Sequence, residues 1–308
     1  MGGIQVRPTL HCSGRPDTPS LLRMNRPITI MLLLVAVVIW GWTFVVVKDA
    51  VADFGIIPFL ALRFTLGAAC LTPFALRSAS RADFRPGLWI GLALGFAFLF
   101  QTIGLAHGTA TNAGIITGLF VVFAPLANRF LFGVRTGWMN WVGIGVSLIG
   151  LAMLTGLGAA PALATDAITL LGAVLFGVHI ALLDRYAKSH RPLALAWGQT
   201  SIAALLFLLA SPFFEPWSWP SPSVWAALVI TGVLATAGGF YVQTVAQRHL
   251  PAVQAAMIIL AEPLFAALFG YLLHDDLLTA AQWAGAGVLI GAVVAVELLP
   301  LLRKSTSS

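Results

Sequence analysis

The most unusual side chain of this sequence is Glu262, which lies in the middle of a long apolar stretch and directly before Pro263. A charged group at the centre of a membrane costs about 2.5–3.5 kcal/mol, so such groups face a bundle interior or a wet cavity. Proline donates no backbone hydrogen bond and kinks a helix, which leaves the carbonyl of Ile259 free. We expect Glu262 to be a protonatable or cation-binding group of a cavity. A structural hydrogen bond to the kinked backbone is the alternative.

Pro125 holds the corresponding place in an earlier apolar stretch, where it frees the carbonyl of Val121. Interrupted helices at corresponding positions of two halves of a chain indicate a binding site near the middle of the membrane. Pro125 and Pro263 are therefore the predicted helix-break positions.

Two further ionisable side chains lie within apolar stretches. Arg63 could bind a carboxylate through two parallel hydrogen bonds, neutralise Glu262 as an internal ion pair, or extend its long stem toward the membrane surface. His179 titrates near neutral pH where water reaches it, and a hydrogen-bonded, neutral interior histidine is the structural alternative. Both residues are candidates for the cavity.

Uncharged polar and aromatic side chains complete the candidate site. Gln101, Gln243 and Tyr241 either face a cavity or form hydrogen bonds between helices, which contribute about 0.6 kcal/mol on average. Gln101 and Gln243 occupy matching places in an internal repeat described below, and this favours a position between the two halves. Trp42 could form an apolar wall of the cavity, with packing against lipid as the alternative.

Long apolar helices have to position these residues, as the composition indicates. Of 308 residues, 59% are hydrophobic and 9% are charged, against about 45–50% and 25% in an average soluble domain. The mean hydropathy is +0.94. These values exclude a soluble enzyme and a disordered chain. The net charge of +6 is not pooled on one face, which excludes a nucleic-acid binder.

A membrane-spanning helix needs about 20 mostly apolar residues, and the chain offers ten such stretches. They are expected at 28–47, 55–77, 86–106, 111–132, 137–155, 166–183, 192–212, 224–246, 251–273 and 279–301. The apolar runs are continuous and do not alternate with a period of two, as the strands of a barrel do. The predicted fold class is an all-α polytopic membrane protein.

Small residues four positions apart predict where these helices touch. Gly87, Gly91 and Gly95 form one such face, and Gly287 and Gly291 form another. Glycine at this spacing lets two helix backbones approach closely.

Basic residues lie on one side of the membrane in this ten-span arrangement. The two tails and the connections after spans 2, 4, 6 and 8 hold 15 of the 17 basic residues, whereas Lys48 lies opposite and Arg63 lies within a span. Because cytoplasmic segments are enriched in basic residues, both termini are predicted to be cytoplasmic, in a bacterial inner membrane. The first two connections are expected at 48–50 and 77–86.

The chain contains an internal repeat of five helices. Segments of the first half recur in the same order in the second: QT at 101–102 and 243–244, FVVFAPL at 120–126 and IILAEPL at 258–264, WVGIG at 141–145 and WAGAG at 283–287. Because five is odd, the second half enters the membrane from the opposite side. We predict two inverted five-helix repeats, at 28–155 and 166–302, after a disordered cytoplasmic tail at 1–27.

Inverted repeats are typical of secondary transporters, which bind their substrate near the membrane midplane between the repeats. The expected mechanism is alternating access, in which the two halves rock about that site. Two other classes stay open as alternatives. A polytopic membrane enzyme acting on lipid-linked substrates would need long loops with clustered polar residues, and a channel or scaffold would need a polar pore stripe or large soluble domains.

Several motifs resemble those of the EamA type within the drug/metabolite transporter superfamily. They are QTIGL at 101–105, NAGIITGLFVVFAPL at 112–126, LPAVQAA at 250–256 and AEPLFAALFG at 261–270. The resemblance covers residues 28–302 and is specific for the fold but not for a substrate. It implies a ten-helix exporter of small metabolites, amino acids or drugs, with helices 5 and 10 at the periphery.

The sequence contains neither a Walker loop nor a cluster of metal ligands. We therefore expect no catalytic residue, no cofactor and no metal site. The expected partners are a small-molecule substrate and the lipid bilayer, without nucleic acid, and a homodimer is left open.

Overall fold

The computed structural model describes residues 26–77, 79–108, 110–155, 163–273 and 278–305. All regular elements of this part of the chain are helices, which confirms the predicted fold class. Within these described ranges, nine helical stretches are long and apolar enough to cross a membrane, and the shorter apolar stretch Ala280–Ala295 makes ten. The predicted tail lies outside the described residues, except for its last two positions.

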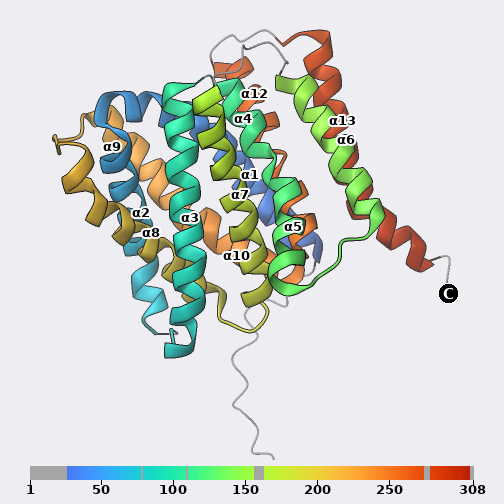
Figure 1. Ribbon diagram of the computed structural model, residues 1–308, viewed down its shortest axis with the longest axis horizontal. Helices are drawn as coiled ribbons and strands as arrows, with labels where there is room; N and C mark the ends of the chain where they lie inside the picture. The colour runs from blue at the N-terminus through green and yellow to red at the C-terminus, as the bar shows by residue number, and fades with distance from the viewer. Residues whose placement is uncertain (1–25, 78, 109, 156–162, 274–277, 306–308) are drawn as a thin grey trace, which may run out of the picture.

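The first half of the chain forms five spans. They are α1 (Arg26–Phe54), α2 (Ile56–Ala75), α3 (Arg81–His107), the pair α4 (Ala110–Gly118) and α5 (Phe120–Phe132), and α6 (Trp138–Thr155). The second half follows the same plan, with its fourth span again divided (Figure 1). Its spans are α7 (Leu163–Tyr186), α8 (Pro192–Phe214), the series α9 (Pro222–Val229), η1 (Ile230–Gly238) and α10 (Gly239–His249), the pair α11 (Ala252–Ile259) and α12 (Glu262–Leu273), and α13 (Ala280–Ser305).

The first two connections are shorter than the charge pattern predicts. α1 continues through Lys48 and Asp49, because both charged side chains are exposed at the end of the helix and require no break. The turn falls at Gly55, whose φ of 93° lies in the left-handed region that glycine adopts without a steric penalty. α3 likewise begins at Arg81, within the predicted connection.

A contact between the two halves holds the turn from α1 to α2. The Oε2 atom of Glu215, in the connection from α8 to α9, accepts a hydrogen bond of 2.8 Å from the backbone N–H of Ile57. Ser221 in the same connection donates to Oδ2 of Asp53 over 2.9 Å. The first N–H groups of a helix have no partner within it, so a carboxylate at this position stabilises the start of α2.

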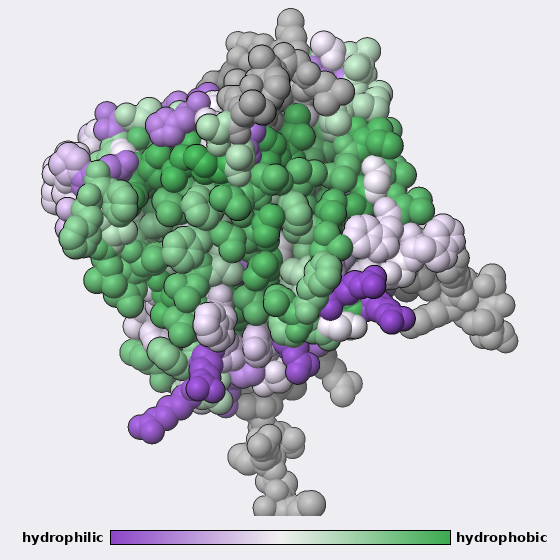
Figure 2. Space-filling model, in the orientation of Figure 1, coloured by the Kyte–Doolittle hydropathy of each residue, from purple (hydrophilic) through white to green (hydrophobic). Residues whose placement is uncertain are grey.

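The ten spans form one bundle with two different ends (Figure 1). The connections from α2 to α3, α5 to α6, α7 to α8 and α10 to α11 lie at the lower end of the view. We call this the basic end, because these connections and the helix turns beside them carry most of the arginines and lysines of the described residues. Figure 2 shows a broad hydrophobic band on one face, with hydrophilic side chains gathered above and below it. This is the surface that a membrane-spanning bundle presents to lipid.

α6 and α13, the last helices of the two halves, pack side by side at one edge of the bundle (Figure 1). A Cβ atom built on Gly150 would lie 2.7 Å from the backbone nitrogen of Leu289, and Gly285 lies directly against Leu154. Residue numbers rise along α6 where they fall along α13. The two helices are therefore antiparallel, as inverted repeats require.

Only one of the two predicted glycine faces makes a close helix contact. A Cβ atom built on Gly87 would lie 3.3 Å from the Cα atom of Gly198, so α3 and α8 touch through their backbones. The prediction that Gly287 and Gly291 form a close helix contact is wrong, because no described atom of a neighbouring element lies within 4 Å of a Cβ atom built on either residue. Contact in α13 is made at Gly285, two residues before Gly287 and therefore on nearly the opposite side of the helix.

Candidate functional site

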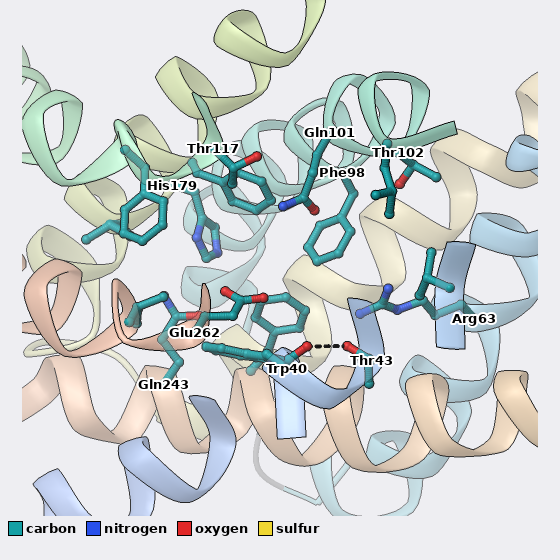
Figure 3. Close-up of a pocket in the computed structure, with 17 residues that line it drawn as sticks. Trp40, Thr43, Arg63, Phe98, Gln101, Thr102, Thr117, His179, Gln243 and Glu262 are labelled. Carbon is teal, nitrogen blue, oxygen red and sulfur yellow. Dashed lines mark hydrogen bonds between the residues drawn. The ribbon is translucent and has the colours of Figure 1, made fainter. Parts of the chain in front are cut away.

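A cavity of about 70 Å³ lies at the centre of the bundle. Its walls come from α1, α2, α3, α4 with α5, α7, α10, and α11 with α12 (Figure 3). This volume holds roughly five water molecules at about 10–15 Å³ each. α6 and α13 contribute no wall residue, in agreement with the peripheral place that the family resemblance implies.

Glu262 is the first residue of α12, and its carboxylate points into the cavity (Figure 3). Among the described residues, no group donates a hydrogen bond to this carboxylate. The alternative of a carboxylate bonded to the kinked backbone is therefore unsupported. The first turn of a helix favours a negative charge, which lowers the free energy of placing Glu262 there.

The break of the second divided span lies directly before Pro263. α11 ends at Ile259 and α12 begins at Glu262. The backbone N–H of Ala261 bonds to the carbonyl of Ile258 over 3.1 Å, and that of Leu264 bonds to Ala261 over 3.1 Å. Both are short-range bonds of the 3₁₀ type, and the ring of Pro263 prevents the α-helical bond that would bridge the break.

The first divided span breaks elsewhere than predicted. Its break is at Leu119, between α4 and α5, whereas Pro125 lies inside α5. The N–H of Leu119 bonds to Ile116 over 3.1 Å and the N–H of Val122 bonds to Leu119 over 2.9 Å, so the chain tightens there. Pro125 is not a helix-break position, because α5 accommodates the one hydrogen bond that it lacks.

Arg63 on α2 faces Glu262 from the opposite side of the cavity (Figure 3). Only 3% of its surface is exposed, which excludes extension toward the membrane surface. Its Nε donates to Oγ1 of Thr236 over 3.0 Å, and its guanidinium lies 4.7 Å from the ring centre of Phe98 and 5.9 Å from that of Phe64. Although both residues belong to the described part of the chain, no direct ion pair joins Arg63 to Glu262.

A π-helical segment, η1, supplies the partner of Arg63, although the sequence predicted a continuous helix there. Next to Thr236, the carbonyl of Ala235 accepts a hydrogen bond of 2.8 Å from the indole Nε1 of Trp40. A Cβ atom built on Gly239 would lie 2.7 Å from the same Nε1. The wide turn thus places two oxygen acceptors behind the wall residues Arg63 and Trp40, and π-helical insertions are frequent at functional sites.

His179 lines the cavity and is the first member of a buried hydrogen-bond chain. Its Nε2 lies 2.7 Å from Oε1 of Gln199, whose Nε2 donates to Oγ1 of Thr244 over 3.1 Å. Thr244 in turn donates to the carbonyl of Phe240 over 2.6 Å. The chain joins α7, α8 and α10, and it matches the alternative of a hydrogen-bonded interior histidine.

The two repeat-matched glutamines both line the cavity. Gln243 donates to Oε1 of Gln247 over 3.1 Å, and Gln247 donates to the carbonyl of Ile180 over 2.8 Å. This second chain runs from the cavity toward the basic end. Gln101 extends into the cavity from α3, on the opposite wall (Figure 3).

Trp42 and Tyr241 lie outside the cavity, contrary to the sequence prediction. Trp42 packs against Phe269, with 6.4 Å between the ring centres, and 40% of Tyr241 is exposed. The wall residues in these helices are Trp40 and Phe240. An α-helix turns by about 100° per residue, so a side chain one or two positions away faces another direction.

Sequence reasoning missed several wall residues, and helical spacing was the available signal. The missed residues are Trp40, Thr43, Val47, Phe98, Thr102, Leu105, Thr117, Phe120, Phe176, Ile180, Phe240 and Ile259. In α3, positions 98, 101, 102 and 105 follow the spacing of one helix face. Oγ1 of Thr117 is buried without a hydrogen-bond partner among the described residues, so it is free to bond a ligand.

The ionisable side chains of the cavity wall are few and of both signs. Among the described residues, no three His, Cys, Asp or Glu side chains are grouped as metal ligands. The ionisable wall residues are Glu262, Arg63 and His179, and the rest of the wall is aromatic, aliphatic or uncharged. A membrane-embedded bundle of two inverted halves, with opposed charges in a cavity between them, defines a membrane transport protein.

The chain belongs to the EamA-like transporter family, whose sequence pattern matches it twice, at residues 27–156 and 163–298. An uncharacterized transporter of Archaeoglobus fulgidus is 32% identical over 269 residues, which cover 86% of this chain and 84% of that protein. The uncharacterized inner membrane transporter YedA of Escherichia coli K12 is 25% identical over 276 residues, covering 85% and 88%. A crystal structure with 21% identity matches with a TM-score of 0.77 over 89% of this chain and 99% of that one, which supports the fold alone.

Proposed function

We propose that this transporter exports small zwitterionic solutes, amino acids among them, across a bacterial inner membrane. The observation that carries this proposal is the opposition of Glu262 and Arg63 across the cavity without a direct ion pair. A solute with an ammonium and a carboxylate group would neutralise both side chains at once. Hydrogen bonds to charged groups contribute about 1.5–3 kcal/mol each, so both ends of such a solute would be recognised.

The rest of the wall suits a compact solute with an apolar body. Phe98 packs edge-on against Phe176 and Phe240, with ring centres 5.3 and 5.8 Å apart, and these rings cover the cavity between the two charges. Because the cavity measures only about 70 Å³, we expect small solutes to be preferred, or the cavity to widen as the halves move.

Alternating access fits the asymmetry of the cavity. Wall residues Val47 and Leu105 continue it toward the ends of α1 and α3 that lie away from the basic end. Toward the basic end, α5, α7 and α10 pack together and are joined by buried hydrogen bonds. The named location of the Escherichia coli relative supports an inner membrane, and the export direction is what the family resemblance implies.

Counterflow in proteoliposomes tests the substrate class. Three labelled solutes of one carbon skeleton are compared: the amino acid, the amine that lacks the carboxylate, and the acid that lacks the ammonium. The wild type should exchange the amino acid best. The exchange rate of the amino acid should fall about 10- to 100-fold in Glu262→Gln, and the rate of the acid should fall less. In Arg63→Gln the rate of the amino acid should also fall, and the rate of the amine should fall less.

A matched control is Asp49→Asn, which removes an exposed carboxylate at the end of α1 and should leave all three rates unchanged. Equal exchange of amine, acid and amino acid by the wild type would refute the zwitterion proposal. Loading the vesicles on one side and adding solute to the other determines the direction separately.

A further inference from the structure

A second hollow, which we call the α3–α8 groove, lies between these helices at the basic end and measures about 530 Å³. Ser80 and Arg81 lie at its mouth. On α8 the wall begins at Ala194 and reaches Ser201 and Ile202, about two helical turns farther along. It is separate from the central cavity and shares no wall residue with it. Its wall residue Phe84 is 65% exposed, so the groove opens on the outer surface of the bundle.

Small residues at the helix crossing create the groove. Gly87 and Gly198 bring the backbones of α3 and α8 together and leave its floor without side chains. Phe84 and Trp197 rise on either side as walls. The indole Nε1 of Trp197 donates to Oγ1 of Thr72 over 3.0 Å, which holds this wall in place.

The mouth of the groove carries an excess of positive charge. Arg77, Arg81 and Arg85 are exposed, and none of the three forms a hydrogen bond or ion pair with another described residue. The nearby carboxylate of Asp83 is occupied by the capping box of α3. Its Oδ2 accepts bonds of 2.9 Å from the backbone N–H and 2.8 Å from the hydroxyl of Ser80.

We propose that the α3–α8 groove binds an anionic phospholipid from the leaflet at the basic end. The phosphate would lie at the mouth, within reach of Arg81 and Arg85, because arginine forms paired hydrogen bonds with phosphate oxygens. Basic pockets between membrane helices on the cytoplasmic side are suited to acidic lipid headgroups. The first part of one acyl chain would lie along Phe84, Leu88 and Ile202.

The dimensions of the groove agree with this occupant. From Ala194 to Ile202 the α8 wall extends by eight residues, or about 12 Å at 1.5 Å per residue. With the basic end at the headgroup level, a groove of this length would end within the hydrocarbon layer. A soluble phosphate would use only its charged mouth, whereas a lipid uses the charged mouth and the apolar walls together.

Native mass spectrometry of the purified full-length protein tests the proposal without reference to transport. The probes are phosphatidylglycerol and phosphatidylcholine with identical acyl chains. The wild type should retain phosphatidylglycerol at least about tenfold more strongly. The double variant Arg81→Gln with Arg85→Gln should lose this preference, and Ser201→Phe, which fills the groove, should weaken binding of both lipids.

Two control variants should behave like the wild type. Arg129→Gln removes an exposed arginine of the basic end outside the groove, and Leu205→Phe enlarges an exposed apolar residue of α8 outside it. Thermal unfolding and gel filtration of every variant establish that it is folded.

Equal retention of the two lipids by the wild type would overturn the proposal, as would undiminished binding by folded Ser201→Phe. Displacement of phosphatidylglycerol by inorganic phosphate alone would show a soluble-anion site instead. A dimer that Ser201→Phe dissociates would show that the groove is occupied by a second copy of the chain.

Discussion

Glu262 and Arg63 are held apart by the architecture around each of them. Arg63 is fixed by Thr236 and by the face of Phe98, and such cation–π contacts contribute about 0.5–2 kcal/mol. Glu262 is fixed by its place at the start of α12. Two opposite charges that are buried without contact are expensive for stability, so their separation indicates a site kept open for a ligand.

We also expect Glu262 to couple transport to protons. Of the ionisable wall residues, Arg63 stays charged at all physiological pH values and His179 is engaged by Gln199. Glu262→Gln keeps the size of the side chain but removes its titration. We expect the residual uptake of the amino acid by this variant to become independent of an imposed pH gradient.

Liposomes with a defined internal pH provide the measurement, and His179→Gln serves as the comparison variant. Coupling that survives in Glu262→Gln but disappears in His179→Gln would assign the proton to the histidine instead. Coupling that survives in both variants would show that neither side chain carries the transported proton.

At the scale of elements, the π-helical segment η1 determines how α1 and α10 fit together. Gly239 follows this segment directly, and the ring of Trp40 occupies the space that a side chain would need. The adjacent Gly238 is exposed, and the nearest atom to a Cβ atom built there lies 3.6 Å away. Substituting alanine for each of the two glycines therefore tests two effects separately: close packing at Gly239 and helix propensity at Gly238.

Gly239→Ala should lower the free energy of unfolding by about 1–3 kcal/mol, because overpacking forces the Trp40 ring to shift. Gly238→Ala should be neutral or stabilising, since alanine favours a helix by up to about 1 kcal/mol over glycine. Thermal unfolding of both variants in one detergent measures the difference. Equal unfolding temperatures would contradict the close fit of α10 against Trp40.

The basic end is closed by contacts between α5 and α7, which belong to different halves. Asn128 donates to Oδ2 of Asp184 over 2.9 Å, and Lys188 pairs with Oδ1 of Asp184 over 2.7 Å. Only 7% of Asp184 is exposed. If the halves rock, this contact between them has to break for the cavity to open at the basic end.

Asn128→Ala should therefore favour opening at the basic end. The lost bond to a carboxylate is worth about 1.5–3 kcal/mol, which corresponds to at least a tenfold rise in the open population. A Gln243→Cys reporter, with Cys12 and Cys70 replaced by serine, measures this opening through its rate of labelling by a charged thiol reagent from the basic side. Arg129→Ala, which changes an exposed neighbour on α5, should leave the labelling rate unchanged. An unchanged labelling rate in Asn128→Ala would show that the contact between Asn128 and Asp184 does not control opening.

At the scale of the whole molecule, the two halves enclose one cavity and differ in the charge of their connections. Arg77 in the connection from α2 to α3, and Arg81 and Arg85 in the first turns of α3, have no partner among the described residues. The counterpart connection from α8 to α9 carries Glu215, which caps α2. Each half therefore contributes differently to the two ends of the bundle. This asymmetry gives a symmetric fold a single orientation.

The orientation itself is a prediction that reporter fusions can check. An alkaline phosphatase fused after Ser308 should be inactive because it stays in the cytoplasm. The same enzyme inserted after Pro216, between α8 and α9, should be active in the periplasm. The reverse pair of results would place the basic end outside and contradict the positive-inside argument.

The sequence alone determined the number of spans, the division into halves and the interior position of Glu262 and Arg63. It did so because lipid satisfies no backbone hydrogen bonds, so every apolar stretch of sufficient length has to become a helix. Charges in the connections and in the spans are equally local features, since each carries its own transfer free energy. No knowledge of how the helices pack is needed for any of these inferences.

Only the tertiary structure decided which face of each helix reaches the cavity. Hydropathy does not distinguish Trp40 from Trp42, and it favours the hydroxyl-bearing Tyr241 over Phe240 for a polar cavity, which the structure contradicts. The break at Leu119 instead of Pro125 and the π-helical turn at Thr236 likewise depend on neighbours that are remote in the chain. Packing between helices determines these positions, because the contacts involved join residues from different stretches of the sequence.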